Sequence, residues 1–330
     1  LNVITIGDLI QKDLEKAYFL PQQPSSYSKG YRFQNSTKYQ VFDSPPPPLS
    51  FNQTLFPLRN LATTGDKIQL VMESEPPSYL QEHWNNTMPD FPLASVKSVD
   101  EALLDDIPIA DMGWCGRGSQ IVRGEGELTS TTTHFRDLCG WDGRIVFQEF
   151  IPGVKEVPSF QFHLSKSGEM FWVGTTHGKF DGLKWIAATV DWRKQEEYRD
   201  LVHEEFTIPI KNYPLKNGYF GLVTFEVLFT DHGKFMVDLN PRVGGETSHL
   251  LLARHMASMF GLKHSAMFSE NTHNFSGKWL VQKANGLNEK IEGRLVILAV
   301  ADEPHGCNSD VSVFAQSAEE VQDIFGTLTS

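Results

Sequence analysis

Residues 218–261 constrain the fold of this chain more than any other stretch. Two runs of alternating character, 222–229 and 234–240, flank a short turn, and residues 241–245 (PRVGG) then lead into an apolar segment with helical spacing. Side chains on a strand point to opposite faces in turn, whereas one face of a helix recurs every three or four residues. The stretch therefore predicts a β-hairpin that feeds a helix, with Thr247 or Ser248 as its N-cap and Gly261 at its end.

The register of this hairpin sets two acidic side chains against each other. With a loop at 231–233 and Gly233 at the position that tolerates positive φ, residue 230 faces 234 and Glu226 faces Asp238. Facing carboxylates lie roughly 5 Å apart at Cβ and destabilise a sheet unless a positive charge lies between them. Alternation places Asn240 on the face of Asp238, together with Met236, and places Phe235, Val237 and Leu239 on the other. Carboxylate and amide oxygens suit Mg²⁺ or Mn²⁺ held jointly with phosphate oxygens.

Composition limits the classes of protein that this chain can belong to. The 330 residues are enough for two or three domains, and the longest apolar run, 295–301, is far shorter than the roughly 20 residues that a bilayer requires. A net charge of −12 argues against nucleic acid or an anionic membrane as the main partner. Three cysteines without paired spacing suggest neither a disulfide framework nor a zinc site, so a cytoplasmic location is expected.

A glycine-rich loop at 113–119 follows a brief strand at 107–111. Gly116 and Gly118 allow backbone N–H groups to approach an anion, while Arg117 and Ser119 add a positive charge and a hydroxyl donor. The loop is therefore a candidate for binding nucleotide phosphates. A glycine-rich turn without a ligand is the alternative.

A second candidate for nucleotide binding is the strand predicted at 144–151. Its end offers backbone donors and acceptors and a flat apolar wall, as an adenine ring requires, through Gln148, Glu149, Phe150 and Ile151. Glu156 is placed to accept ribose hydroxyls, and the alternative for the two phenylalanines, Phe147 and Phe150, is ordinary core packing.

The remaining segments predict a mixed α/β fold. Short strands are expected at 3–6 and 67–72, and a helix is expected to start at a capping box formed by Ser98 and Glu101. A further helix is predicted at 127–138, an amphipathic surface helix at 192–206 and a last helix capped by Ser317. Further strands are predicted at 158–164, 170–176, 185–190, 294–300 and 310–315. His177 and Lys179 could reach a phosphate or lie on an exposed loop.

The order of these motifs resembles the ATP-grasp superfamily over roughly residues 95–325. The most specific part is Glu226 followed twelve residues later by Asp238-x-Asn240-Pro241-Arg242. The resemblance implies that Glu226, Asp238 and Asn240 ligate Mg²⁺ and that Arg242 steadies the phosphoryl group and an anionic intermediate. It also implies that 148–151 holds adenine, that Glu156 holds ribose and that the loop at 113–119 closes over the phosphates.

One position departs from the pattern of that family. A lysine usually stands on the strand before the glycine loop, and the position that aligns with it here is Ile109. Either the alignment is shifted, another cation such as Arg117, Lys155 or Lys179 takes its place, or nucleotide affinity is reduced.

The resemblance implies four regions: an N-terminal α/β domain (1–94), a small lobe with the glycine loop (95–150), a large lobe with the metal site (151–285) and a closing β-β-α lobe (286–330). It implies an ATP-dependent ligase that activates a carboxylate as an acyl phosphate and joins it to an amine or thiol. Small-molecule acid and amine substrates and a homodimer are expected. The alternatives are a catalytically impaired nucleotide-binding scaffold and a kinase that acts on a hydroxyl or enol.

Overall fold

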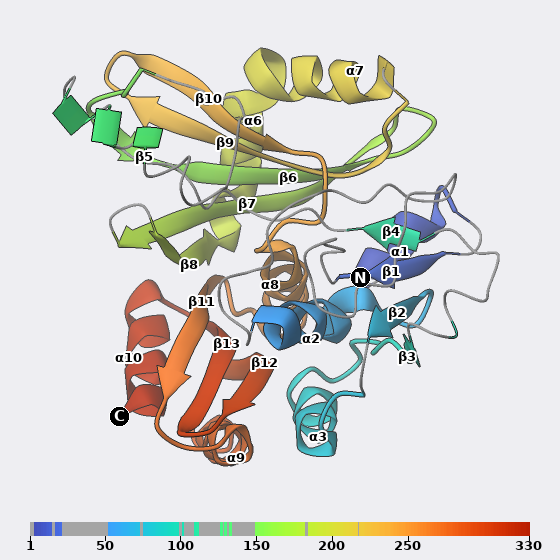
Figure 1. Cartoon of the computed structure of the whole chain (residues 1–330), viewed down its shortest axis with the longest axis vertical. Coiled ribbons are helices and arrows are strands. Elements are labelled where there is room, and N and C mark those ends of the chain that lie inside the picture. Colours follow the sequence, from blue (N-terminus) through green and yellow to red (C-terminus); the bar gives the residue numbers. More distant parts are fainter. Residues whose placement is uncertain are drawn as a thin grey trace.

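The computed structural model describes residues 3–14, 17–21, 52–72, 75–98, 101, 109–111, 126–127, 129–130, 132–133, 149–181, 184–216 and 218–330. These residues form two sheets with helices packed between and around them (Figure 1). The predicted mixed α/β class is confirmed. Of the helices in these ranges, none combines the length and the apolar character needed to cross a bilayer.

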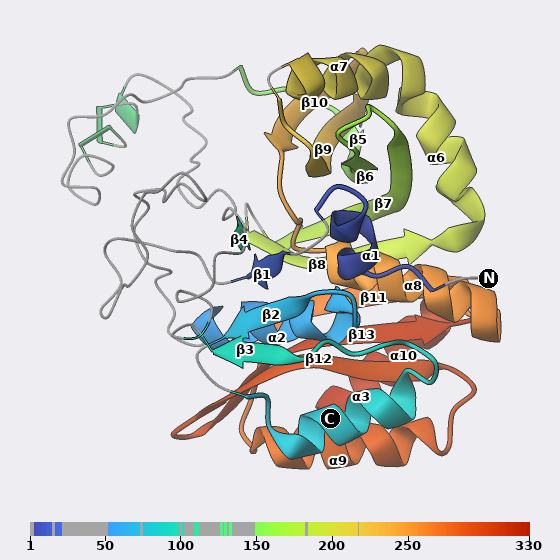
Figure 2. The same cartoon turned by 90° about the vertical axis from the view of Figure 1, so that its right-hand side faces the viewer.

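The N-terminal unit is a four-stranded parallel sheet in the order β3-β2-β1-β4, seen edge-on in Figure 2. Its strands are β1 (Tyr18–Leu20), β2 (Gln69–Met72), β3 (Val96–Ser98) and β4 (Ile109–Asp111), and its helices are α1 (Ile6–Gln11), α2 (Asn52–Thr64) and α3 (Ser78–Thr87). The strand predicted at 3–6 is wrong. Thr5 and Asp8 form a capping box that starts α1 instead, since the Thr5 side chain accepts from the Asp8 amide and the Asp8 carboxylate accepts from the Thr5 amide.

This sheet extends further along the chain than residue 94. Strand β3 pairs with β2, and β4 pairs with β1 so that Ile109 lies opposite Tyr18. Ile109 therefore belongs to the N-terminal sheet and not to a strand of the predicted small lobe. The predicted capping box of Ser98 and Glu101 is present, with the Glu101 amide 3.3 Å from Ser98 Oγ.

A nine-stranded antiparallel sheet forms the rest of the molecule, in the order β10-β9-β6-β7-β8-β11-β13-β12 with β5 paired to β9. Strand β11 pairs with both β8 and β13, so the regions predicted at 151–285 and 286–330 share one continuous sheet. The strands are β5 (Val154–Glu156), β6 (Pro158–Leu164), β7 (Met170–Asp181), β8 (Lys184–Asp191), β9 (Gly221–Thr230), β10 (Gly233–Asn240), β11 (His264–His273), β12 (Arg294–Glu303) and β13 (Gly306–Ala315).

Helices cover both faces of this sheet. A nearly continuous helical segment comprises a 3₁₀ turn (Trp192–Lys194), α6 (Gln195–Val202), a π-helical turn (His203–Thr207) and α7 (Ile208–Lys216), which extends the helix predicted at 192–206. It packs on one face against Phe160, Phe162 and Phe225 in the smaller of two cores. On the other face, α8 (Thr247–Phe260) lies against β7, β11 and α2 (Figure 1).

The larger core joins the N-terminal unit to β11, β13 and β12. Helices α9 (Gly277–Asn288) and α10 (Ala318–Thr329) close the C-terminal end. Phe325 of α10 stacks on Phe268 with ring centroids 3.6 Å apart, while Ser265, on the opposite face of β11, bonds to His249 of α8. Helices α8 and α10 therefore lie on opposite sides of the same strand.

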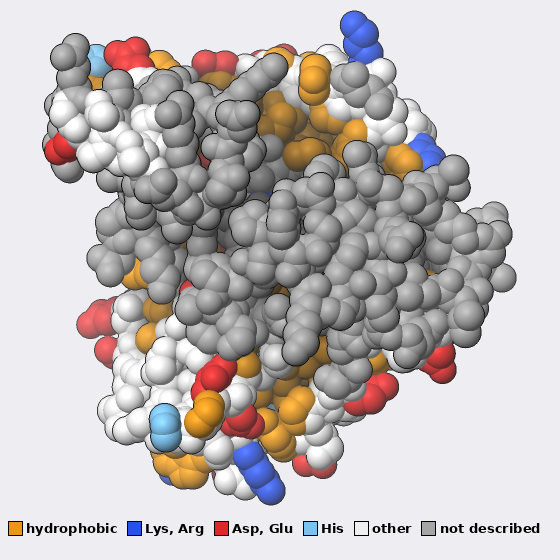
Figure 3. Space-filling view, viewed as in Figure 1, with side chains coloured by type: hydrophobic (Ala, Val, Ile, Leu, Met, Phe, Trp, Pro, Cys, Tyr) orange, Lys and Arg blue, Asp and Glu red, His pale blue; other side chains and the backbone are white. Residues whose placement is uncertain are grey.

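Described Lys and Arg side chains stand singly on the face of the molecule shown in Figure 3 and are separated by neutral and acidic side chains. Nucleic-acid-binding surfaces gather such side chains into a patch or stripe. The described surface on this face has no such arrangement.

Candidate metal and nucleotide site

The hairpin of β9 and β10 places Glu226 opposite Asp238, as predicted, but by a different route. Its turn contains only Asp231 and His232, and Gly233 is already paired with Thr230. The register then shifts between Met236 and Asp238, which inserts one extra residue into β10. The predicted three-residue loop is therefore wrong, and the bulge restores the pairing that this loop was expected to produce.

The bulge also changes which side chains of β10 share a face. Residues opposite each other on antiparallel strands point to the same side. Met236 lies opposite Val227 of the smaller core, and Phe235 lies opposite Leu228, whose side chain shares the face of Glu226. The predicted grouping of Met236 with Asp238 is wrong, whereas the alternation predicted for β9 is confirmed by the burial of Val223, Phe225 and Val227 together.

The three predicted metal ligands meet at this position. Asn240 Nδ2 donates a hydrogen bond to Asp238 Oδ2 at 2.5 Å, and Asp238 lies opposite Glu226. Asp238 is exposed, whereas Glu226 and Asn240 are half-buried. The ligand set thus lies on the rim of the sheet face, where an incoming ligand can reach it.

Negative charge at this position exceeds the nearby positive charge. Burial, together with the charges of Glu246 and Asp238, raises the pKa of Glu226 to about 7, and the charge of Arg242 opposes the shift. Burial likewise raises the pKa of Glu246, against a backbone hydrogen bond and the charges of Arg242 and Arg59. The combined negative charge favours a cation nearby. Among the described residues, no three His, Cys, Asp or Glu side chains lie close enough together to hold an ion by themselves.

Polar side chains continue the site across the neighbouring strands. Ser159 of β6 lies between Glu226 of β9 and Thr176 of β7. In the next row Thr224 lies between Asn240 and Gln161. The hydroxyl oxygens of Ser159, Thr176 and Thr224 are buried and have no hydrogen-bond partner within the described part of the chain.

The loop after β10 packs directly on this polar face. A Cβ at Gly244 would lie 2.8 Å from Thr224 Oγ1 and 3.0 Å from Gln161 Nε2, so only glycine allows this approach. The Gly244 amide donates to Thr247 Oγ1 at 2.8 Å, and Thr247 Oγ1 donates to Gln161 Oε1 at 2.7 Å. Helix α8 begins after Glu246, which makes no side-chain cap, so the predicted Thr247 or Ser248 cap is wrong.

Arg242 lies between the strand end and the start of α8. Its amide donates to the Asn240 carbonyl at 2.9 Å, and Nη1 donates to the Val243 carbonyl at 3.1 Å. A helix N-terminus carries a partial positive charge and free N–H donors, which favour an anion. Arg242 and the start of α8 therefore present positive potential beside the carboxylates.

Arg59 of α2 anchors the same loop from the N-terminal unit. It is 4% exposed, and its Nη1 donates to the Gly245 carbonyl at 3.0 Å. Its Nε and Nη2 donate to Asp310 Oδ2 of β13 at 2.9 and 2.6 Å. The N-terminal unit thereby fixes the position of the loop that follows β10.

Several residues predicted to bind nucleotide lie outside the described residues, namely Gly116, Arg117, Gly118, Ser119 and Gln148. Glu149, Phe150 and Ile151 are described and are not in a strand, so the predicted strand does not extend through them. Phe150 is 65% exposed, which excludes a core role for its side chain. The adenine role of these residues stays a prediction.

Glu156 lies on the opposite face of the sheet from Glu226, because it pairs with Phe229. Its Oε2 accepts a hydrogen bond from Tyr198 at 3.0 Å and lies 3.4 Å from His177 Nε2. The ribose role of Glu156 stays a prediction. His177 and Lys179 both lie within β7, and His177 packs against Tyr198 of α6 instead of lying on a loop.

Glu246 and the buried polar residues on one face of β6, β7 and β9 were not predicted from the sequence as parts of the site. Ser159, Gln161 and His163 alternate with Phe160, Phe162 and Leu164, and all six are buried. Polar residues with a period of two opposite an aromatic face indicate a strand whose second face is also covered. That pattern was visible in the sequence, whereas the burial of Glu246 depends on tertiary contacts.

Neither family models nor curated proteins match this chain. Solved structures similar to it include the ADP complex of purK, an N5-carboxyaminoimidazole ribonucleotide synthetase, at 11% identity and a TM-score of 0.49 over 96% of this chain and 97% of that one. The phosphoribosylaminoimidazole carboxylase ATPase subunit of Aquifex aeolicus has 13% identity and a TM-score of 0.43 over 79% and 91%. The biotin carboxylase of Campylobacter jejuni in a β-γ-ATP complex has 15% identity and a TM-score of 0.41 over 63% and 53%.

The resemblance of this chain to the ATP-grasp superfamily therefore rests on its sequence motifs. The similarities to solved structures do not extend to its reaction, since every quoted TM-score is below 0.5. The chemistry of the site is therefore inferred from the residues of this chain alone.

Proposed function

We propose that this protein is an ATP-dependent ligase that activates a carboxylate as an acyl phosphate and joins it to an amine or thiol. ADP and phosphate would be released, and both organic substrates would be small molecules. One observation carries the proposal: Glu226 is paired with Asp238, and Asn240 donates a hydrogen bond to Asp238. These residues come directly before Arg242 and the start of α8.

The ligand set fits a hard divalent cation. Glu226, Asp238 and Asn240 would hold Mg²⁺ or Mn²⁺, and the ion would neutralise charge on the phosphates of ATP when bound. The pKa of Glu226 is raised first by burial and then by the charges of Glu246 and Asp238, and a bound cation would offset both effects. A protein with no use for a cation has no reason to place two carboxylates opposite each other in a sheet.

The residues after the strand would orient the acceptor. Arg242 would hold the anionic acid beside the transferred phosphoryl group, where a fixed positive charge lowers the barrier to phosphoryl transfer. The hydrogen bonds from Gly244 to Thr247 and from Thr247 to Gln161 hold the loop in place. Arg59 holds the same loop from the other side.

The alternative of an impaired scaffold rested on the absence of a lysine at Ile109. Ile109 is paired with Tyr18 in the N-terminal sheet, so this position belongs to that sheet and not to the predicted small lobe. Nothing else in the described residues favours the scaffold, so the ligase remains the proposal.

The proposed reaction is tested by incubating the protein with ATP, Mg²⁺ and a panel of acids and amines and measuring the release of phosphate. We expect release only when an acid and an amine are both present, with a new amide among the products. Asp238→Asn should lower the rate on the order of 100-fold, as expected when an electrostatic contact to the transition state is lost. Asp323→Asn, at an exposed position of α10, is the matched control and should leave it unchanged.

Equal rates for wild type and Asp238→Asn would contradict the proposal. Phosphorylation of a hydroxyl or enol acceptor without amide formation would replace the ligase with the kinase alternative.

A further inference from the structure

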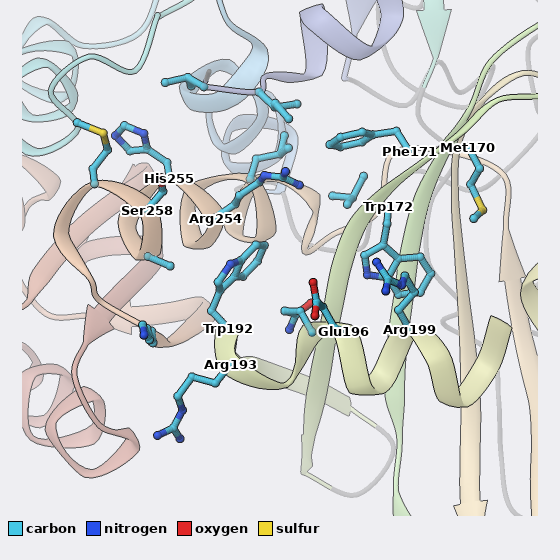
Figure 4. A pocket seen from close by; sticks show the side chains of 18 of the residues that line it. Met170, Phe171, Trp172, Trp192, Arg193, Glu196, Arg199, Arg254, His255 and Ser258 are labelled. Atoms are coloured by element: carbon cyan, nitrogen blue, oxygen red, sulfur yellow. The ribbon is translucent and has the colours of Figure 1, made fainter. Parts of the chain in front are cut away.

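A cleft of about 820 Å³ lies at the opposite end of α8 from Arg242 (Figure 4). The C-terminal half of α8, the start of β7 and helix α6 form its walls. This volume is within the range of pockets that hold small organic ligands. A helix of 14 residues is about 20 Å long, so the cleft is a separate place from the metal-ligand strand.

Positive side chains predominate in the lining of this cleft. Arg199, Arg254 and Lys263 line it, together with Arg193, which points away from its centre in Figure 4. Arg193 is paired with Asp191 and Arg199 with Asp200, so the charge that is available for a ligand comes from Arg254 and Lys263. Glu196 is the one carboxylate among its lining residues. This balance is opposite to the net charge of −12 for the whole chain, so the cleft stands out as a local site for an anion.

Arg254 is the most distinctive of these residues. It is half-buried, and no carboxylate or hydrogen-bond acceptor contacts its guanidinium among the residues that the structure describes. Its Cζ lies 5.1 Å from the centroid of the Phe171 ring, and burial lowers its pKa. A partly desolvated guanidinium without an anion is costly, and an incoming carboxylate or phosphate would compensate it.

Aromatic rings line the cleft beside this charge. In Figure 4, Arg254 projects from α8 between Trp192, at the start of the helical segment, and Phe171 of β7. Trp172 also lines the cleft, but as the next residue of β7 it lies on the opposite face of the strand, beside the smaller core. Flat apolar walls of this kind favour a planar body, while the guanidinium selects the charged end of the ligand.

We propose that this cleft is a second ligand site, which binds a small organic anion that joins a carboxylate or phosphate to an aromatic body. This site is independent of the proposed ligase reaction, because it uses none of the residues assigned to metal or phosphoryl transfer. The elements common to the two sites are α8 and β7, in which the sites use different residues.

A matched pair of probes tests the proposal. 2-Naphthoate carries an aromatic body and a carboxylate, and 2-naphthamide has nearly the same shape without the charge. Ligand-detected NMR titration of the full chain should show saturable binding of the naphthoate, with the amide bound at least tenfold more weakly. Inorganic sulfate should compete weakly, because it lacks the aromatic body.

Naphthoate binding to substituted proteins tests whether the ligand occupies this cleft. Arg254→Met should weaken naphthoate binding about tenfold, and Arg254→Lys should weaken it less because the charge remains. Arg294→Met is the matched control, since Arg294 Cζ also lies 5.1 Å from a phenylalanine centroid, that of Phe260, outside the cleft. Asp238→Asn is a second control at the metal-ligand strand. Both controls should bind naphthoate as the wild type does.

Circular dichroism melting of each variant checks that it is folded, and Lys263→Met serves if Arg254→Met does not fold. Equal affinity for naphthoate and naphthamide would overturn the proposal. Binding that resists every substitution in the cleft, or that is lost in Arg294→Met or Asp238→Asn, would also overturn it.

Discussion

His83 of α3 is a buried histidine whose hydrogen bonds require the neutral ring. The Ile297 amide donates to Nε2 at 2.9 Å, so Nδ1 carries the proton toward Asn285 Oδ1 at 2.6 Å. Burial lowers the pKa of His83 to about 4, and the hydrogen bond to Asn285 opposes this only in part. Protonation of Nε2 would break the bond from Ile297.

This residue makes the folded state sensitive to acid. Because its pKa is near 6.5 in the unfolded chain and about 4 in the folded one, the unfolded chain takes up the proton first as the pH falls. Its stabilising contribution is complete above pH 6.5 and is lost toward pH 4. We expect His83→Gln to reduce the loss of unfolding free energy between pH 7 and pH 5 by about 2 kcal/mol.

Urea unfolding at a series of pH values measures this difference. His232→Gln, at the exposed tip of the hairpin, is the control and should show the pH profile of the wild type. Parallel profiles for His83→Gln and wild type would show that His83 is not the source of the acid sensitivity.

At the scale of elements, α8 ends at Gly261, whose φ of 70° is in the left-handed region that favours glycine. Gly286 lies inside α9 with ordinary helical geometry. A Cβ at either glycine would have no atom within 4 Å, so sterics with neighbours do not distinguish them. Backbone conformation alone therefore decides the effect of alanine at each position.

We expect Gly261→Ala to lower the free energy of unfolding by about 1 kcal/mol, because alanine strains the left-handed conformation. Gly286→Ala should raise it by about 0.5–1 kcal/mol, because alanine is the better helix former. Thermal unfolding of the two variants measures both changes. Changes of the same sign would contradict the account of how α8 ends.

The β9–β10 hairpin shows which features of a fold local sequence patterns can predict. The alternation of β9 and the pairing of Glu226 with Asp238 followed from the period of two. The bulge in β10 could not be predicted in this way. A two-residue turn with a bulge and a three-residue loop without one both place Glu226 opposite Asp238. Only the paired partners of Phe235 and Met236 distinguish these alternatives.

At the scale of the whole molecule, Arg59 joins units that lie far apart in the sequence. It connects α2 to Asp310 of β13 and to Gly245 beside the candidate metal site. The N-terminal residues gave no signal of this role, since a single arginine in a helix is usually exposed. Long-range pairing of this kind decides which surface the sheet presents, and no local pattern encodes it.

The pairing partners of the strands could not be predicted from the sequence either. Ile109 lies opposite Tyr18, and β11 links two regions that were predicted as separate lobes. Short strands carry too few residues to specify a partner by their own pattern. The strands themselves were predicted more successfully than the sheets they join.

The central claim is that Glu226, Asp238 and Asn240 bind a metal together with ATP. Calorimetric titration with β,γ-imido-ATP, in Mg²⁺ and then in EDTA, tests it most directly. We expect Mg²⁺ to tighten binding at least tenfold in the wild type and in the control variant Asp323→Asn, and to have no effect in the double variant Glu226→Gln/Asp238→Asn. Binding that is equally tight without metal, or a metal effect that survives in the double variant, would contradict the account.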